Sequence, residues 1–152
     1  MQKKIDIDKL LSLNDVNRSI IEIDNYICAL PEGVKLTEPQ QNFFYNQELE
    51  REINNCGFTQ YFLNSSGDFA HRTIKSLAAI GAHKTAEILQ AAINQFPGGT
   101  VPSNQEERQK IIEQIEDISS GIWNDLDQKF FNYEKNLNAI NIEYVRQNKK
   151  LF

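Results

Sequence analysis

The sequence predicts an all-α fold, a compact bundle of about seven or eight helices in a single domain. Apolar residues recur every three or four positions along almost the whole chain, and no segment alternates long enough for a strand. The 152 residues are 40% hydrophobic and 24% charged, a length and balance typical of one globular domain. We therefore expect one helical domain over residues 1–152, with residues 1–10 as a flexible N-terminal arm.

In the first half of the chain, caps and turn residues divide this periodicity into helices. A helix from about 13 to 30 begins after a capping box of Ser12 and Asp15 and ends before Pro31. The next begins at Thr37, runs to about residue 53 and stops at the Asn54–Gly57 turn, after which residues 58–63 form a short helical turn.

The second half is divided in the same way. Ser65 and Asp68 form a serine-x-x-acid cap that opens a helix ending at Gly81, and residues 82–96 pair with it as a helical hairpin. After a loop over 97–102, Ser103 caps a helix over 104–120 and a further helix carries Trp123. Leu137, Ile140 and Tyr144 line the last helix. In the 104–120 helix we expect a buried stripe, formed by Ile111, Ile115, Ile118 and Ile122.

Charge and cysteine usage restrict the class of protein. A net charge of −5 argues against direct nucleic-acid binding, which needs a basic face. No apolar run approaches the roughly 20 residues that span a bilayer, so we expect no membrane association. Cys28 and Cys56 have no paired spacing and are expected to be buried free thiols in a reducing cytoplasm.

Candidate catalytic residues are few. The chain has two histidines, and Ser65, Ser66, Asp68 and His71 contain the ingredients of a catalytic triad. They fall within seven residues, whereas a triad is assembled from separate elements, so capping explains them better. We therefore expect no catalytic residue and no cofactor.

Metal sites are equally weakly indicated. Asp68-x-x-His71 has the spacing of one carboxylate–histidine pair, but a di-metal bundle needs two such pairs and two further glutamates. Asp125-x-Asp127 begins like a calcium loop but has Phe130 at the sixth position, where that loop requires glycine. The sequence predicts no metal site.

A run of acidic residues is the strongest remaining signal. No basic residue lies between Lys110 and Lys129, a segment that contains Glu113, Glu116, Asp117, Asp125 and Asp127. Carboxylates three or four positions apart on a helix lie about 5–6 Å apart, comparable to the spacing of phosphates along a nucleic-acid strand. The run is either a solvated face or a surface that binds a basic partner.

The segment from Asn55 to Gly99 resembles the signature of the bacterial DNA-mimic-protein family. The resemblance rests first on Asn55 to Asp68, which read NCGFTQYFLNSSGD, and it continues through Ile80-Gly81-Ala82, Phe96-Pro97-Gly98-Gly99 and Arg108-Gln109. It implies a family-like core over about 37–148, an all-α fold, a cytoplasmic protein and function through protein–protein contact. The family pattern has a glycine where this chain has Cys56.

The signature itself has the composition of a structural corner. We expect Gly57 and Gly67 to form turns with positive φ, Phe58 and Tyr61 to pack in the core, and Asn64 and Ser65 to cap helices. The other signature residues are Asn55, Gln60 and Asp68. The alternative is that Gln60 and Asn64 bind a partner.

Three functions follow, in order of preference. The first is a non-enzymatic interaction protein, in the manner of a DNA mimic, that presents the acidic residues to a DNA-binding protein and can form a homodimer. The second is an immunity-type neutraliser of a basic toxin. The third is a hydrolase or metal enzyme that uses Asp68 and His71.

Overall fold

Every regular element in the structure is helical. The computed structural model describes residues 5–132 and 136–152, and over these ranges it contains seven α-helices, three short 3-10 helices and no strand. The α-helices are α1 (Ile7–Leu11), α2 (Val16–Cys28), α3 (Glu38–Leu63), α4 (Ala70–Ala79), α5 (His83–Ile93), α6 (Gln105–Phe131) and α7 (Leu137–Gln147). The 3-10 helices are η1 (Ser65–Phe69), η2 (Pro97–Gly99) and η3 (Lys149–Leu151). The all-α prediction is confirmed.

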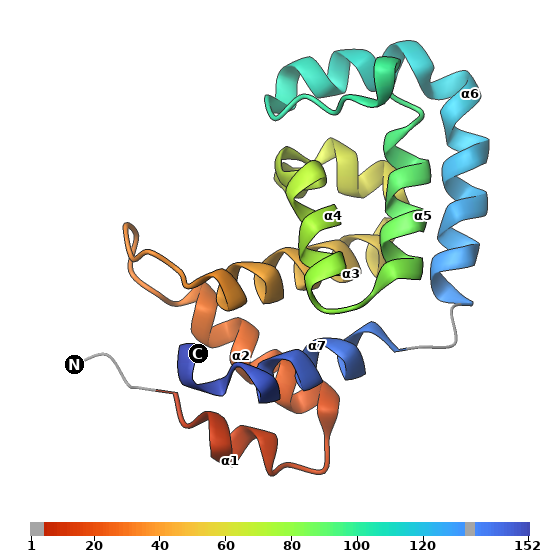
Figure 1. Ribbon diagram of the computed structural model, residues 1–152. Coiled ribbons are helices and arrows are strands. Elements are labelled where there is room, and N and C mark those ends of the chain that lie inside the picture. Colours follow the sequence, from red (N-terminus) through yellow and green to blue (C-terminus); the bar gives the residue numbers. More distant parts are fainter. Residues whose placement is uncertain (1–4, 133–135) are drawn as a thin grey trace.

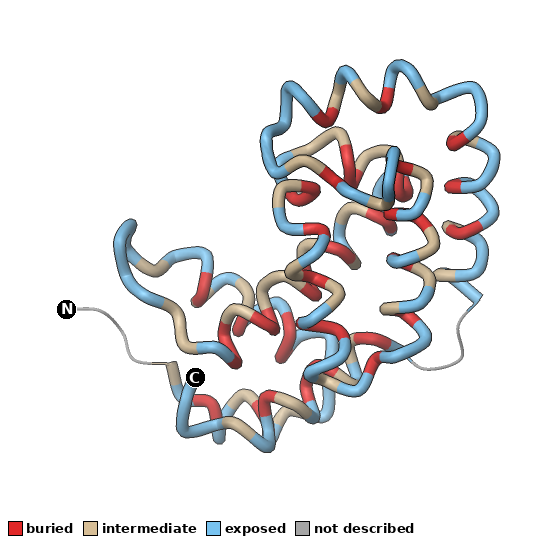
Figure 2. Tube along the Cα trace, turned by 45° about the horizontal axis from the view of Figure 1, so that its top comes forward, coloured by how far each residue is buried: buried red, intermediate tan, exposed pale blue. Residues whose placement is uncertain are grey.

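The long helix α3 connects two groups of helices (Figure 1). Its C-terminal half packs with α4, α5 and α6 around a large apolar core that includes Phe58, Phe62 and Trp123. Its N-terminal half packs with α1, α2 and α7 around a second cluster that includes Ile23, Phe43 and Val145. In Figure 2 the buried positions of both groups face inward, toward the neighbouring helices.

Two helices are longer than the sequence predicts. The segments expected at 37–53 and 58–63 form the single element α3, which is kinked where Cys56 and Gly57 leave helical geometry. The segments expected at 104–120 and around Trp123 form the single helix α6. In Figure 1 this helix crosses the top of the molecule and then turns down beside α5, so one helix lines two sides of the larger core.

The buried stripe predicted for α6 is wrong. Ile118 is 75% exposed and Ile122 is 37% exposed, whereas Ile111 and Ile115 are only partly buried. The side of α6 that faces the core instead carries five buried residues: Arg108, Ile112, Ser119, Trp123 and Leu126. These positions also recur at helical spacing, but two of them are polar, so the apolar pattern alone selected the neighbouring row of isoleucines.

The predicted caps were partly correct. The Thr37 side chain accepts from the Gln40 backbone N–H while the Gln40 side chain accepts from the Thr37 N–H, a complete capping box. The first long helix, α2, is capped by Asp15 and not by Ser12, because the Asp15 carboxylate accepts from the backbone N–H of Arg18. Neither η1 nor α4 has a side-chain cap, so the predicted Ser65 cap is wrong.

The N-terminal segment differs from the expected flexible arm. Residues 1–4 lie outside the described part of the chain, but Ile7–Leu11 form α1, and both Ile7 and Leu11 are buried in the smaller core. Lys149 pairs with Asp8 at 2.8 Å and so joins the beginning of the chain to its end. No helix among the described residues is long and apolar enough to cross a membrane.

Candidate functional site

The signature segment encloses a buried arginine from α6. The Arg108 side chain is fully buried, and its guanidinium donates to the backbone carbonyls of Phe62, Pro102 and Asn64. Its Nη2 also forms an ion pair with the Asp68 carboxylate at 2.7 Å. A buried charge requires such partners because desolvation is costly. Asp68 therefore pairs with Arg108 and does not act as a capping residue.

Gly67 is needed for space in this enclosure. Its φ is not positive, contrary to our expectation, but a Cβ at this position would lie 2.7 Å from Arg108 Nε and 3.0 Å from Phe62 Cα. The adjacent Ser66 hydroxyl donates to the Tyr61 carbonyl at 3.0 Å. The glycine thus lets the η1 backbone approach the buried guanidinium closely.

Gly57 has the positive φ that the sequence predicts. Its φ is +80°, at the kink of α3, and the helix resumes at Phe58. The Phe58 backbone N–H donates to Asp127 Oδ1 at 2.8 Å, so a carboxylate from α6 caps the second half of α3. Burial raises the pKa of Asp127, and the hydrogen bond from Phe58 partly offsets this rise.

The aromatic residues of the signature are part of the larger core, as expected. Phe62 lies against both Phe96 and Trp123, with ring centroids 4.9 and 5.2 Å away. The Tyr61 hydroxyl is buried and donates to Thr73 at 3.2 Å, and burial raises the pKa of this phenol. Asn64 is bound within the chain, since its amide donates to the Glu52 carboxylate. Asn55 and Ser65 are exposed and Gln60 is half-buried.

The polar groups of Asp68 and His71 have structural partners. His71 Nε2 accepts from the Val101 backbone N–H at 3.0 Å, which attaches the loop before α6 to α4. The Asp68 carboxylate is paired with Arg108 and not with His71. Among the described residues, no group of three or more histidine, cysteine, aspartate or glutamate side chains is placed to hold a metal ion.

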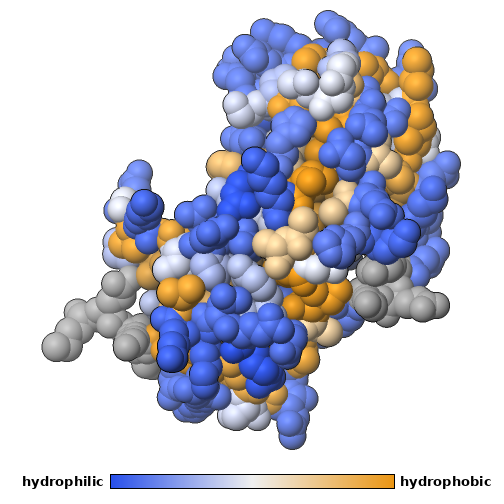
Figure 3. All heavy atoms as spheres, in the orientation of Figure 1, coloured by the Kyte–Doolittle hydropathy of each residue, from blue (hydrophilic) through white to orange (hydrophobic). Residues whose placement is uncertain are grey.

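The structure separates the five acidic residues proposed to bind a partner. Glu113, Glu116, Asp117 and Asp125 are exposed, and none has an ion pair with a cationic side chain among the described residues. Asp127 differs, since it is half-buried and bound to Phe58. In Figure 3 hydrophilic atoms cover much of the upper and right-hand margin of the molecule, where α6 lies. Their role in partner binding stays a prediction.

Apolar side chains accompany these acids on α6. Ile118 and Ile122 are one helical turn apart and both reach solvent, and Phe131 at the end of the helix is 48% exposed. Figure 3 shows apolar atoms among the hydrophilic ones at the upper right of the molecule. The outer side of α6 is therefore amphipathic, with isoleucines beside carboxylates, and is not uniformly acidic.

Sequence reasoning missed the structural role of Arg108. The signal that was available is its spacing, because Arg108 lies four residues before Ile112 and therefore on the same side of the helix. The two cysteines also differ from expectation. Both are free thiols as predicted, but Cys28 and Cys56 are exposed and not buried.

Comparison with known proteins gives one match. Neither the search of curated proteins nor the search of solved structures found a similar protein. A family model described as DMP19-like protein matches residues 34–148, which include the whole signature, the Arg108 enclosure and α6. These boundaries are close to the core expected at 37–148. The chain belongs to the family of DMP19-like proteins.

Proposed function

We propose that this protein is a non-enzymatic interaction protein of the DNA-mimic type, which presents the outer side of α6 to the basic DNA-binding surface of another protein. The observation that carries the proposal is the exposure of Glu113, Glu116, Asp117 and Asp125 without ion pairs among the described residues. Membership of the DMP19-like family supports a role in protein–protein contact of this type.

Charge placement favours this surface over the rest of the molecule. The net charge of −5 is modest, so attraction to a basic partner depends on where the carboxylates gather. Elsewhere, several carboxylates are already paired with cations: Asp8 with Lys149, Asp24 and Glu48 with Arg51, Glu87 with Lys84, and Glu143 with Arg146. Glu113, Glu116, Asp117 and Asp125 have no such cation among the described residues and can pair with an external partner. Two free thiols are in keeping with a reducing, cytoplasmic compartment.

A displacement experiment tests this function. Proteins of the source cell are bound to immobilised duplex DNA and then eluted with this protein. We expect wild type to release at least one DNA-bound protein and Glu116→Gln/Asp117→Asn to release less. The control, Glu22→Gln/Glu32→Gln, removes the same charge from exposed sites outside α6 and should act like wild type. Failure to release any protein, or equal loss in both variants, would contradict the proposal.

A second candidate is the neutraliser of a basic protein such as a toxin. It is favoured by one observation, the exposure of Ile118 and Ile122 beside the carboxylates. A phosphate array offers no apolar contact, whereas specific protein interfaces combine an apolar centre with a polar rim. If Ile118→Ser abolishes complex formation and the complex resists high salt, the neutraliser is the better description.

An enzymatic function finds no support at Asp68 and His71. The Asp68 carboxylate is paired with Arg108, and His71 Nε2 accepts from Val101. Activation of a nucleophile would require His71 to be held by an orienting group while a second ring nitrogen faces the substrate. Both side chains instead hold neighbouring segments of the fold together.

A further inference from the structure

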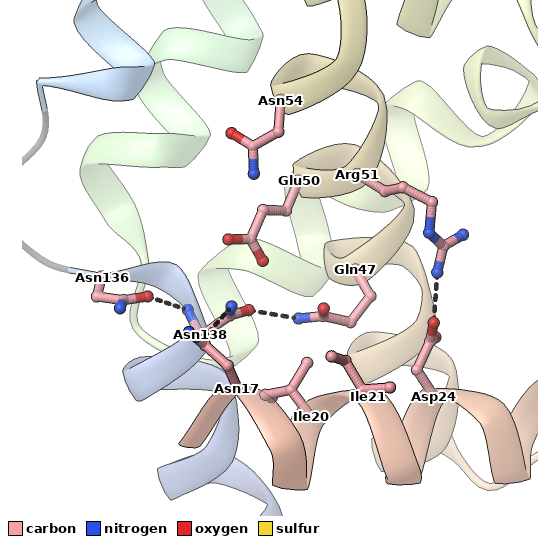
Figure 4. A pocket seen from close by; sticks show the side chains of 10 residues that line it. All are labelled: Asn17, Ile20, Ile21, Asp24, Gln47, Glu50, Arg51, Asn54, Asn136 and Asn138. Atoms are coloured by element: carbon pink, nitrogen blue, oxygen red, sulfur yellow. Dashed lines mark hydrogen bonds and ion pairs between the residues drawn. The ribbon is translucent and has the colours of Figure 1, made fainter. Parts of the chain in front are cut away.

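A pocket of about 520 Å³ lies between α2, α3 and the beginning of α7. Figure 4 shows its lining, which comes from three segments far apart in the sequence. The residues are Asn17, Ile20, Ile21 and Asp24 from α2, Gln47, Glu50, Arg51 and Asn54 from α3, and Asn136 and Asn138 at the beginning of α7. Half of these side chains are amides.

Hydrogen bonds fix the amides on one side of the pocket. Gln47 Nε2 donates to Asn138 Oδ1 at 3.2 Å, and Asn138 Nδ2 donates to Asn17 Oδ1 at 3.1 Å. The Asn138 backbone N–H donates to Asn136 Oδ1 at 2.9 Å. This chain joins all three segments, so the pocket is preorganised and costs little to order when a ligand binds.

Among the described residues, no cation pairs with Glu50 in this pocket. The only guanidinium in the lining, that of Arg51, is held by Asp24 and Glu48. Burial raises the pKa of Glu50, and a hydrogen bond with Gln47 partly offsets this rise. A cation that donates hydrogen bonds would stabilise the charged form of a half-buried carboxylate such as Glu50.

The rest of the pocket also suits a ligand with a cationic head. Asp24 Oδ1 is buried and has no hydrogen-bond partner among the described residues. The Asn54 side chain faces Glu50 in Figure 4. On the α2 side, Ile20 and the 57%-exposed Ile21 provide an apolar surface for an alkyl stem.

We propose that this pocket binds a primary alkylammonium group, with Glu50 as its counter-ion, the amide oxygens as further acceptors and Ile20 and Ile21 against the alkyl chain. An ammonium has three donors and no acceptor, which matches the Glu50 carboxylate together with the other oxygen acceptors of the lining. A free amine and a lysine side chain of another protein both carry this group.

The site is independent of the proposed function. Its α2 residues precede residue 34, where the family match begins, so the pocket is formed where this chain's own N-terminal segment meets the family-matched region. It lies on α2, α3 and α7, whereas the proposed partner surface lies on α6. Loss of one function therefore does not entail loss of the other.

Titration of the full chain with n-butylammonium chloride, followed by backbone amide NMR, tests the proposal. We expect millimolar binding with shifts at α2 and at the α3 residues of the pocket, and no comparable binding of n-butanol, which lacks the charge. Glu50→Gln should weaken binding about tenfold or more, because it removes a charge-assisted hydrogen bond. Glu32→Gln, an exposed glutamate outside the pocket, should bind like wild type.

The titrations distinguish a free amine from a protein-borne lysine, and they also include outcomes that would overturn the proposal. Stronger binding of Nα-acetyl-lysine methylamide than of butylammonium would identify a protein-borne lysine, and the reverse order a free amine. Absence of shifts in the pocket, equal binding of butanol, or unchanged affinity of Glu50→Gln would overturn the proposal. Glu50→Gln removes a desolvated charge, so the variant should fold, which its circular dichroism spectrum checks.

Discussion

The Asp127 carboxylate on α6 accepts a hydrogen bond from the backbone N–H of Phe58 on α3, at 2.8 Å. The donor lies directly after the kink at Gly57, where the helix begins again and its first N–H groups have no partner within the helix. A Cβ at Gly57 would lie 2.1 Å from Asp127 Oδ2. The absence of a side chain at Gly57 and the cap by Asp127 therefore depend on each other.

Gly57→Ala should destabilise the protein by more than the ordinary cost of alanine at positive φ. That ordinary cost is about 1–2 kcal/mol. The control is Gly81→Ala, since Gly81 has nearly the same φ of +82° but open space where a Cβ would be added. The difference between the two free energies of unfolding in urea measures the conflict with Asp127. Equal losses of unfolding free energy in both variants would show that Asp127 on α6 can move away from the added Cβ without a measurable loss of stability.

The charge of Asp127 should make its contribution to stability depend on pH. Its pKa is raised in the folded state, so the folded protein favours the protonated form, and that stabilisation is lost as pH rises through the folded pKa. Asp127→Asn keeps an oxygen acceptor for Phe58 without the charge. We expect the stability of Asp127→Asn relative to wild type to increase from acid to neutral pH. Urea denaturation of both proteins across this range gives the comparison, and a relative stability that decreases would contradict the prediction.

Removal of Arg108 should unfold or strongly destabilise the protein. Arg108→Ala leaves the carbonyls of Phe62, Pro102 and Asn64 without their donor and Asp68 without its cation. Breaking a buried pair in this way costs about 3–5 kcal/mol. Arg146→Ala is the control, because Arg146 pairs with Glu143 at the surface and should cost under about 1 kcal/mol. Thermal melts that shift equally would refute a structural role for Arg108.

Substitution of His71 should affect stability slightly and partner binding hardly at all. His71 is exposed, and His71→Ala removes one acceptor, that of the Val101 N–H. A hydrogen bond of this kind contributes about 1 kcal/mol. The DNA-displacement assay with this variant provides the readout. Complete loss of displacement at an unchanged melting temperature would contradict this prediction and place His71 in the partner-binding surface.

The sequence by itself determined the helical class, most helix positions and the positive φ of Gly57. These depend on interactions within a few residues, such as the Thr37 capping box and the turn at positive φ. The family was also recognisable from the segment Asn55 to Gly99, because the signature is a local string of glycine, aromatic and amide residues.

The tertiary structure alone decided which side of α6 is buried and what the signature encloses. Arg108 is buried because carbonyls and a carboxylate from residues about 40 positions earlier surround it, and no local pattern encodes such a contact. The same applies to Asp127, a member of the acidic run, whose hydrogen bond with Phe58 caps α3. A polar side chain can be buried only where distant backbone groups satisfy it, so its position follows from the packing of the helices and not from the periodicity of one helix.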